Sequence, residues 1–150
     1  MITVNVKELS DFSLFLRSVA PELDKAFLSS LTEVGEVVKK KAQTNANAFP
    51  REHAKTDRIA QSLKVRRRGT RVTVVAGGTS APEATPLEHG GHPGKIRHPV
   101  FGSTTTPWQE QDAHPFLVPA GLESQPEALA ALVSCVDRAF HQSRFINKEF

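Results

Sequence analysis

The chain has 150 residues, of which 39% are hydrophobic, so we expect a single domain spanning residues 1–150 with a modest core. The formal net charge of +3 is too small to indicate a nucleic-acid partner by itself, and the one cysteine, Cys135, excludes an internal disulfide and a cysteine-based zinc site. The opening residues do not resemble a signal peptide, and no stretch approaches the roughly 20 apolar residues of a membrane span. We therefore expect synthesis in the cytoplasm and no membrane partner.

The amino-terminal part predicts a short strand followed by two helices. Residues 1–6 alternate apolar and polar side chains, which is typical of a strand. Ser10 is expected to cap an amphipathic helix that ends before Pro21. Pro21 then opens a longer helix, in which apolar side chains recur every three or four residues to Val38, so we expect one continuous helix with Lys41 in its last turns. The apolar face of the first helix should contain Phe12, Phe15, Leu16 and Val19.

The central part predicts a loop, a short helix and a basic β-hairpin. Residues 44–55 are polar and contain a proline, which indicates a loop, and Thr56 can cap a short helix. Residues 63–76 alternate on both sides of a turn at Gly69, which predicts a hairpin with one apolar and one basic face. The charged-surface candidates on this hairpin are Arg66, Arg67, Arg68 and Arg71.

These arginines have three interpretations. They can form a solvated face that discourages edge-to-edge association, contact an acidic surface of a neighbouring subunit, or contact a polyanion. Aromatic side chains, which would stack on bases, are not interleaved with the arginines. Sequence-specific nucleic-acid recognition is therefore not expected, whereas a non-specific contact stays open.

A long segment rich in proline, glycine and histidine follows the hairpin. Residues 77–97 predict an irregular run that leads into an arm from His98 to Gly121. The four prolines of the arm argue against a helix and predict an irregular or extended segment with at most short edge strands. The arm nevertheless carries large apolar side chains, each of which gains about 1.5–3 kcal/mol when buried. We expect the arm to dock on this chain's own core or on a second copy. The interface candidates are Val100, Phe101, Trp108, Phe116 and Leu117.

The carboxy-terminal part predicts one more helix. Ser124 and Glu127 form a capping-box pattern, with Pro126 in the first turn, and residues 142–150 are expected to fray. Cys135 falls on the apolar side, where a small buried side chain is favoured over a reactive thiol. The elements together predict an α+β fold in which two main helices pack on a small, mostly antiparallel sheet, with a long Pro/Gly/His-rich loop or arm over residues 77–121. The apolar stripe of the last helix should contain Leu129, Leu132, Val133, Val136 and Phe140.

The histidines are the strongest candidates for chemistry. Since three imidazoles and an open position can hold a catalytic zinc ion, His89, His92 and His98 are weak metal-ligand candidates. Their spacing matches no zinc motif, and two of them directly precede prolines, which favours a conformational reason for their presence. Glu88 beside His89 has no third group to orient it as an acid–base pair. We expect no catalytic residue, no cofactor and no bound metal.

The order of these elements resembles a family of tail-completion or neck proteins, also called minor tail components, of long-tailed bacteriophages. The resemblance covers about Leu23 to Phe140. It rests on residues 56–63, the hairpin, Ala84 with residues 87–90, and the Pro-Phe-Leu-Val-Pro-Ala sequence at residues 115–120. The sequence HPVFG at residues 98–102, followed by Trp108 and Gln111, is similar to versions from phages of actinobacteria.

The resemblance implies a structural virion protein, assembled in the host cytoplasm, that forms a homo-oligomeric ring at the head–tail junction without catalysis. Its partners would be the connector or head-closure protein and the tail terminator or tail-tube protein, with a possible non-specific contact to DNA in the channel. A tail terminator ring is the alternative within this class. Alternatives from other classes are a His-ligated metal-dependent hydrolase or nuclease and a non-specific nucleic-acid-binding module.

Overall fold

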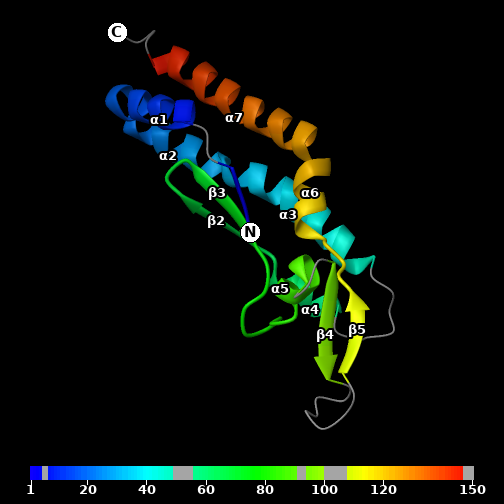
Figure 1. Ribbon diagram of the computed structural model, residues 1–150. Helices are drawn as coiled ribbons and strands as arrows, with labels where there is room; N and C mark the ends of the chain where they lie inside the picture. The colour runs from blue at the N-terminus through cyan, green and yellow to red at the C-terminus, as the bar shows by residue number, and fades with distance from the viewer. Residues whose placement is uncertain (5–6, 49–55, 91–93, 100–107, 147–150) are drawn as a thin grey trace.

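The computed structural model describes residues 1–4, 7–48, 56–90, 94–99 and 108–146 (Figure 1). The fold is α+β, as the sequence predicts, with helices predominating. In chain order the elements are β1 (Ile2–Val4), α1 (Lys7–Val19), α2 (Pro21–Ser30), α3 (Thr32–Asn47), α4 (Thr56–Ser62), β2 (Lys64–Arg68), β3 (Arg71–Val75), α5 (Ala84–His89), β4 (Lys95–Pro99), β5 (Trp108–Asp112), α6 (Leu117–Glu123) and α7 (Gln125–Ile146).

The first sheet is built on the predicted β2–β3 hairpin, with β1 added beside β3 in the order β1-β3-β2, all antiparallel. Gly69 has φ of 60°, the left-handed conformation that the tight turn between Arg68 and Arg71 requires. The hairpin is confirmed, but Arg67 is an exception to the basic face. It lies opposite the buried Val72 on the apolar side, where its exposed guanidinium donates to the carbonyl of Gly69 at 3.0 Å.

Helix α3 packs directly on the apolar face of this sheet. Gly35 makes the close approach possible, because a Cβ atom at this position would lie 2.5 Å from Cγ1 of Val65 and 2.7 Å from Cγ1 of Val72. Further along α3, Ala42 and Ala46 are completely buried. Small side chains along one side of α3 therefore bring its backbone close to its neighbours.

Helix α7 lies along α2 and α3, as Figure 1 shows, so that α3 contacts both the sheet and α7. The buried side chains form two clusters, and the partly buried Val65 packs against both of them. Cys135 of α7 is buried in one cluster, as expected, and its thiol donates to the carbonyl of Ser30 at 3.3 Å. Val65 thus connects the two parts of the core.

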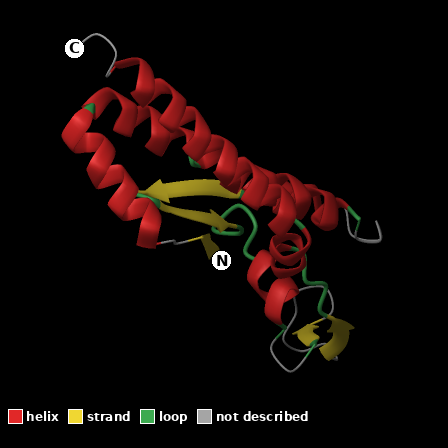
Figure 2. Cartoon of the chain, turned by 90° about the horizontal axis from the view of Figure 1, so that it is seen from above, coloured by secondary structure: helices red, strands yellow, loops and turns green. Residues whose placement is uncertain are grey.

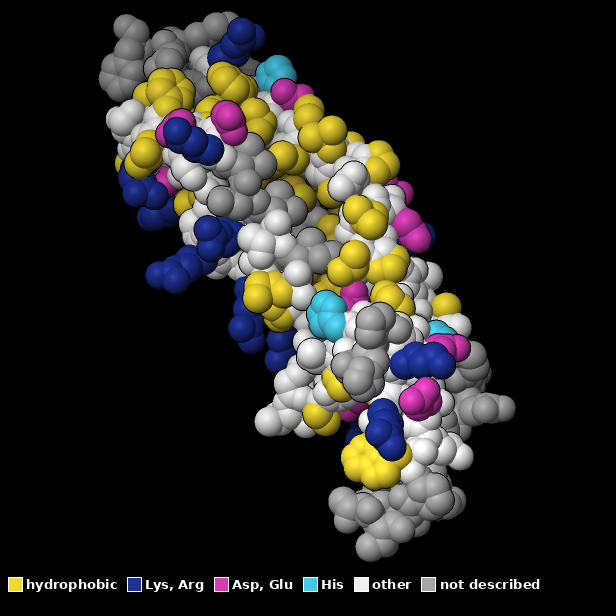
Figure 3. All heavy atoms as spheres, viewed as in Figure 1, with side chains coloured by type: hydrophobic (Ala, Val, Ile, Leu, Met, Phe, Trp, Pro, Cys, Tyr) yellow, Lys and Arg dark blue, Asp and Glu magenta, His cyan; other side chains and the backbone are white. Residues whose placement is uncertain are grey.

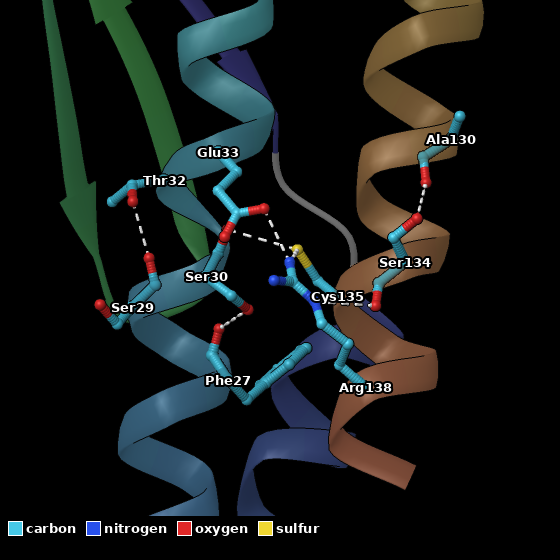
Figure 4. Close-up of polar contacts among 9 residues, drawn as sticks. All are labelled: Phe27, Ser29, Ser30, Thr32, Glu33, Ala130, Ser134, Cys135 and Arg138. Carbon is cyan, nitrogen blue, oxygen red and sulfur yellow. Dashed lines mark hydrogen bonds and ion pairs between the residues drawn. The ribbon is translucent and has the colours of Figure 1, made fainter. Parts of the chain in front are cut away.

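The prediction of one continuous helix from Pro21 is wrong, because the helix breaks at Leu31 between α2 and α3. At this break the Ser30 hydroxyl donates to the carbonyl of Phe27 at 2.7 Å, and the Thr32 hydroxyl donates to that of Ser29 at 2.6 Å (Figure 4). Side-chain hydroxyls that bond carbonyls one turn earlier compete with the helical hydrogen bonds and bend a helix. Helix α3 then continues to Asn47, into the segment where a loop was expected.

Helix α1 also differs from its prediction. It begins at Lys7, so Ser10 is not its cap, and the Ser10 hydroxyl instead lies 2.8 Å from that of Thr70 at the hairpin turn. Phe15 and Val19, expected on the apolar face, are exposed. The side that faces the protein carries Leu9, Ser13 and Leu16.

The polar Ser13 is explained by a buried carboxylate on α2. Asp24 is buried and accepts hydrogen bonds from the Ser13 hydroxyl and from Nε of Arg17, the latter at 3.1 Å. A buried carboxylate is tolerated when it is paired and hydrogen-bonded. This contact joins α1 to α2.

The expectation of a long loop or arm without helices is wrong where α5 and α6 form, whereas β4 and β5 are compatible with the short edge strands that were expected there. Pro119 is part of α6, since the third residue of a helix has no intrahelical partner for its amide and loses nothing by being proline. Helix α7 begins one residue after Ser124, close to the prediction, and continues to Ile146, beyond the point where fraying was expected. The Ser124 hydroxyl donates to the carbonyl of Ala120 at 2.6 Å and so closes α6.

Candidate functional site

A buried carboxylate, Glu88, connects α5 to α6. Its side chain is on the last turn of α5, and the residue is only 7% exposed. Oε2 accepts the backbone N–H groups of Phe116 and Leu117 at 2.8 and 2.9 Å, and Oε1 accepts that of Val118 at 2.7 Å. These amides begin α6, where they have no intrahelical partner and where the helix dipole favours a negative charge. We call this arrangement the Glu88 clasp.

The clasp brings together two sequence pieces that carry the phage resemblance, residues 84–90 and residues 115–120. Glu88 was considered as half of an acid–base pair with His89, but its carboxylate is occupied by three amides and His89 is exposed. The sequence contains one signal for the clasp, which sequence motifs alone do not identify. The N-terminus of α6 has no capping side chain of its own, since Phe116 stands at its N-cap.

The β4–β5 hairpin begins beside the clasp and extends away from the rest of the protein. At its base the amide of Ala113 donates to the carbonyl of Gly94 at 2.7 Å, and the amide of His114 donates to that of Leu87 at 3.0 Å. Both Figure 1 and Figure 2 place this hairpin at the opposite end of the molecule from the C-terminus. We call it the appendage.

Trp108 lies at the far end of the appendage. Its backbone pairs with that of Pro99, whereas the pair nearest the base is Lys95 with Asp112. The indole is 48% exposed, and the guanidinium carbon of Arg97 lies 5.7 Å from the centroid of its ring. A cation above an indole face at this distance is attracted by the ring quadrupole. The appendage therefore presents a large apolar ring to the outside.

The other interface candidates have different locations. Phe116 and Leu117 are only 1% and 2% exposed and pack within this chain's own core, because they form the start of α6 that the Glu88 clasp holds in place. They offer no surface to a partner. Val100 and Phe101 lie outside the described residues. Among the five candidates, Trp108 is the one that the structure shows on a surface.

An exposed apolar stripe follows α6 and the first half of α7. We define the α6–α7 stripe as Val118, Leu122, Leu129 and Val133, which are between 45% and 63% exposed. A groove of ≈ 410 Å³ runs beside it, and Val34 and Val38 of α3 form part of its wall. Figure 3 shows hydrophobic side chains gathered over these helices. Of the stripe predicted for the last helix, Leu129 and Val133 face outward, and Phe140, although half exposed, stacks on Phe12.

The inner side of α7 is held against the α2–α3 break by polar contacts (Figure 4). The guanidinium of Arg138 donates to the Glu33 carboxylate at 2.7 Å and to Sγ of Cys135 at 3.6 Å. The hydrogen bond to Glu33 is the main cause that raises the pKa of Arg138 above its usual value. Arg138 thus pairs with Glu33 between α7 and α3, and the buried Cys135 lies beside this pair.

The four arginine candidates, Arg66, Arg67, Arg68 and Arg71, are all exposed on the β2–β3 hairpin. Figure 3 shows Lys and Arg side chains gathered along the edge of the molecule that this hairpin forms. None of the four makes an ion pair with a residue that the structure describes.

The histidine candidates do not form a site in the described parts of the chain. His89 is exposed at the end of α5, His92 lies outside the described residues, and only the backbone of His98 is described, in β4. Within the described ranges no three His, Cys, Asp or Glu side chains are close enough to hold a metal ion. In the same ranges no helix has the length and apolarity needed to cross a membrane.

Comparison with models of protein families identifies a match to this chain. A family model described as "Bacteriophage HK97-gp10, putative tail-component" matches residues 10–90. Searches of curated proteins and of solved structures find no match. The matched region begins within α1 and extends through α5, so it includes the β2–β3 hairpin and Glu88, and it ends before the appendage. Because this match covers more than half of the 150 residues, the chain belongs to the HK97-gp10-like family of bacteriophage tail components.

Proposed function

We propose that this tail component forms a homo-oligomeric ring at the phage head–tail junction, as a neck or tail-completion subunit between the connector and the tail tube. Family membership makes it a virion protein that contacts other virion proteins. The ring and its position are our proposal. A structural subunit of this kind needs no catalytic residue, and we propose none.

The observation that carries this proposal is the appendage with its exposed Trp108. A closed ring with head-to-tail contacts needs a projecting element on each copy and a receiving surface on the next. The appendage is the projecting element, and the α6–α7 stripe is an apolar surface of the kind that receives one. Tryptophan is the residue type most enriched among binding hot spots.

We further propose that residues 1–150 act as one domain from which only the appendage extends. Val65 packs against both buried clusters, and α3 contacts the sheet, α6 and α7. A subunit with one continuous core can keep its ring contacts in fixed positions relative to one another.

The ring is tested by size-exclusion chromatography with light scattering, on the protein alone and mixed with the phage's connector and tail-tube proteins. We expect a discrete oligomer in at least one of these samples. A monomer in all of them contradicts the proposal. Co-elution with the tail-tube protein but never with the connector would instead place the protein at the tail terminator position.

Replacing Trp108 by alanine is expected to weaken assembly by about 30-fold, because truncation of a hot-spot side chain costs about 2 kcal/mol or more of binding free energy. The far-ultraviolet circular dichroism spectrum should stay native, since the indole is half exposed and lies outside both core clusters. The measurement is the oligomer fraction as a function of protein concentration.

The matched control is Phe15→Ala, which removes a 53% exposed aromatic side chain from α1, far from the appendage in sequence. It should assemble as the unchanged protein does. Equal assembly of both variants would exclude Trp108 as an anchor. Loss of folded structure in Trp108→Ala alone would place the indole in a structural role and also contradict the anchor.

A further inference from the structure

We propose that the outer face of the β2–β3 hairpin contacts duplex DNA through its phosphates, without sequence specificity. We define this outer face as Lys64, Arg66, Arg68, Arg71 and the two threonines Thr3 and Thr73. The inference rests on the proposed ring, in which this face of each subunit would line the channel through which DNA passes. Family membership shows only that the chain is a tail component. The proposal adds the class of ligand that this surface binds.

The first step is the concentration of charge. The eight residues from Lys64 to Arg71 contain five of the 19 basic side chains of the chain and none of its 16 acidic ones. The other 142 residues therefore contain 14 basic and 16 acidic side chains and are slightly acidic. The basic character of this protein is located in one hairpin, and a local field of one sign attracts oppositely charged partners.

The second step is the orientation of these cations. Strand pairing puts Arg66 opposite Thr73 and Arg68 opposite Arg71, on the face of the sheet away from the buried Val72 and Val74. Helix α3 covers that buried face. The outer face is continued by β1, where the hydroxyls of Thr3 and Thr73 lie 3.3 Å apart. Cations and hydroxyls are the side chains that bind phosphate oxygens.

The spacing of the cations fits a regular polyanion. Lys64, Arg66 and Arg68 are alternate residues of one strand, so their Cα atoms lie about 6.8 Å apart along it, twice the rise of about 3.4 Å per residue. Duplex DNA carries one negative charge per about 1.7 Å of its axis, both strands counted. A row of cations at this spacing can therefore meet several phosphates at once.

A hollow at the tip of the hairpin brings Arg17 of α1 next to two arginines of the outer face, Arg68 and Arg71. It has a volume of ≈ 530 Å³ and is lined in part by Arg17, Arg68 and Arg71, together with the hydroxyl-bearing Ser10 and Thr70. Arg17 reaches it from α1 while its Nε bonds Asp24. A phosphate group at this place would meet guanidinium groups from three elements, α1, β2 and β3.

An acidic face of a second copy fits these arginines less well. Many acidic side chains of the described residues already have partners in their own chain, among them Asp24, Glu33, Glu36, Glu88, Glu110 and Glu123. The others are divided among several elements, such as Glu8 and Asp11 on α1, Asp112 on β5 and Asp137 on α7. The acidic side chains of the described residues are thus spread over several elements, whereas DNA is a continuous polyanion.

The test compares two variants of equal net charge. One replaces Arg66, Arg68 and Arg71 by glutamine, and the control replaces Lys7, Lys40 and Arg144 by glutamine, since these are also exposed and make no ion pair within the described residues. Binding of a fluorescent duplex of about 30 base pairs is measured by anisotropy between about 50 and 200 mM salt. Light scattering and circular dichroism are recorded on the same samples.

We expect the hairpin variant to show a salt slope smaller in magnitude than that of the control by about 0.9 for each phosphate that is no longer neutralised, about 3 per subunit in all, with its ring intact. Equal binding of the duplex by the two variants overturns the proposed DNA contact.

If the unchanged protein forms a ring that does not bind the duplex, the DNA contact is also overturned, but the proposed ring function is not. In that case, binding to a connector or tail protein is compared between the variants. If the hairpin variant fails to bind and the control variant still binds, this face contacts an acidic protein partner. Steep, hairpin-dependent DNA binding by a protein that stays monomeric would support the surface and contradict the ring.

Discussion

The variant Glu88→Ala is expected to lose about 3–5 kcal/mol of the free energy of unfolding. The substitution leaves three backbone amides at the start of α6 without their acceptor, and an unsatisfied buried donor costs about 1–3 kcal/mol. Because these groups share one carboxylate, their losses are not additive, and partial hydration of the exposed Val118 reduces the total. The measurement is urea denaturation, in which the midpoint falls while the slope stays near that of the unchanged protein.

Two controls separate the clasp from a general loss of charge. Glu88→Gln keeps one acceptor oxygen but loses the negative charge at the helix start, so it should fall between the alanine variant and the unchanged protein. Glu127→Ala removes an exposed carboxylate from the first turn of α7 and should change stability by no more than about 0.5 kcal/mol. If Glu88→Ala lost less than about 1 kcal/mol, the three hydrogen bonds would not be what holds α6 in place.

Gly35→Ala is expected to destabilise the protein by about 1–3 kcal/mol, the usual cost of overpacking a core. On helix propensity alone the substitution should be stabilising by about 1 kcal/mol, so the expected sign is opposite to the local preference. The reason is the close approach of α3 to the sheet, where the new methyl would lie 2.5 Å from Val65 and 2.7 Å from Val72. Thermal and urea unfolding of the purified variant measure the effect.

A double-mutant cycle with Val65→Ala identifies the cause. Val65→Ala alone should destabilise, because it opens space in the region that joins the two clusters. In the Gly35→Ala background the same change removes the nearer of the two close contacts of the new methyl, so the combined loss should be smaller than the sum of the single losses by about 1 kcal/mol or more. Additive losses would mean that Gly35 is required for another reason.

The sequence was most informative where local rules decide the structure. Alternation of apolar and polar side chains around Gly69 was enough to predict the β2–β3 hairpin, because its register depends on a two-residue turn within the same segment. The start of α7 was placed within one residue by Pro126 and its neighbours. The family was identified from the order of short motifs, none of which would have sufficed alone, and the family match confirms it.

The failures concern contacts between distant residues. Nothing near Pro119 indicates a helix, since α6 is capped by Glu88, which is about 30 residues earlier in the chain. The break at Leu31 depends on two hydroxyl groups whose alternative partners cannot be chosen from spacing alone. Periodicity also finds apolar faces without showing which are covered, so it grouped the exposed Leu129 and Val133 with the buried side of α7.

The base of the appendage determines how freely its length can change. Its two strands leave the body at one point, where the amide of His114 meets the carbonyl of Leu87, and the family match ends at residue 90, just before the excursion begins. A hairpin mounted in this way can be lengthened or shortened while the chain on either side keeps its path. A change in the length of the appendage is therefore expected to leave α5 and α6 in place.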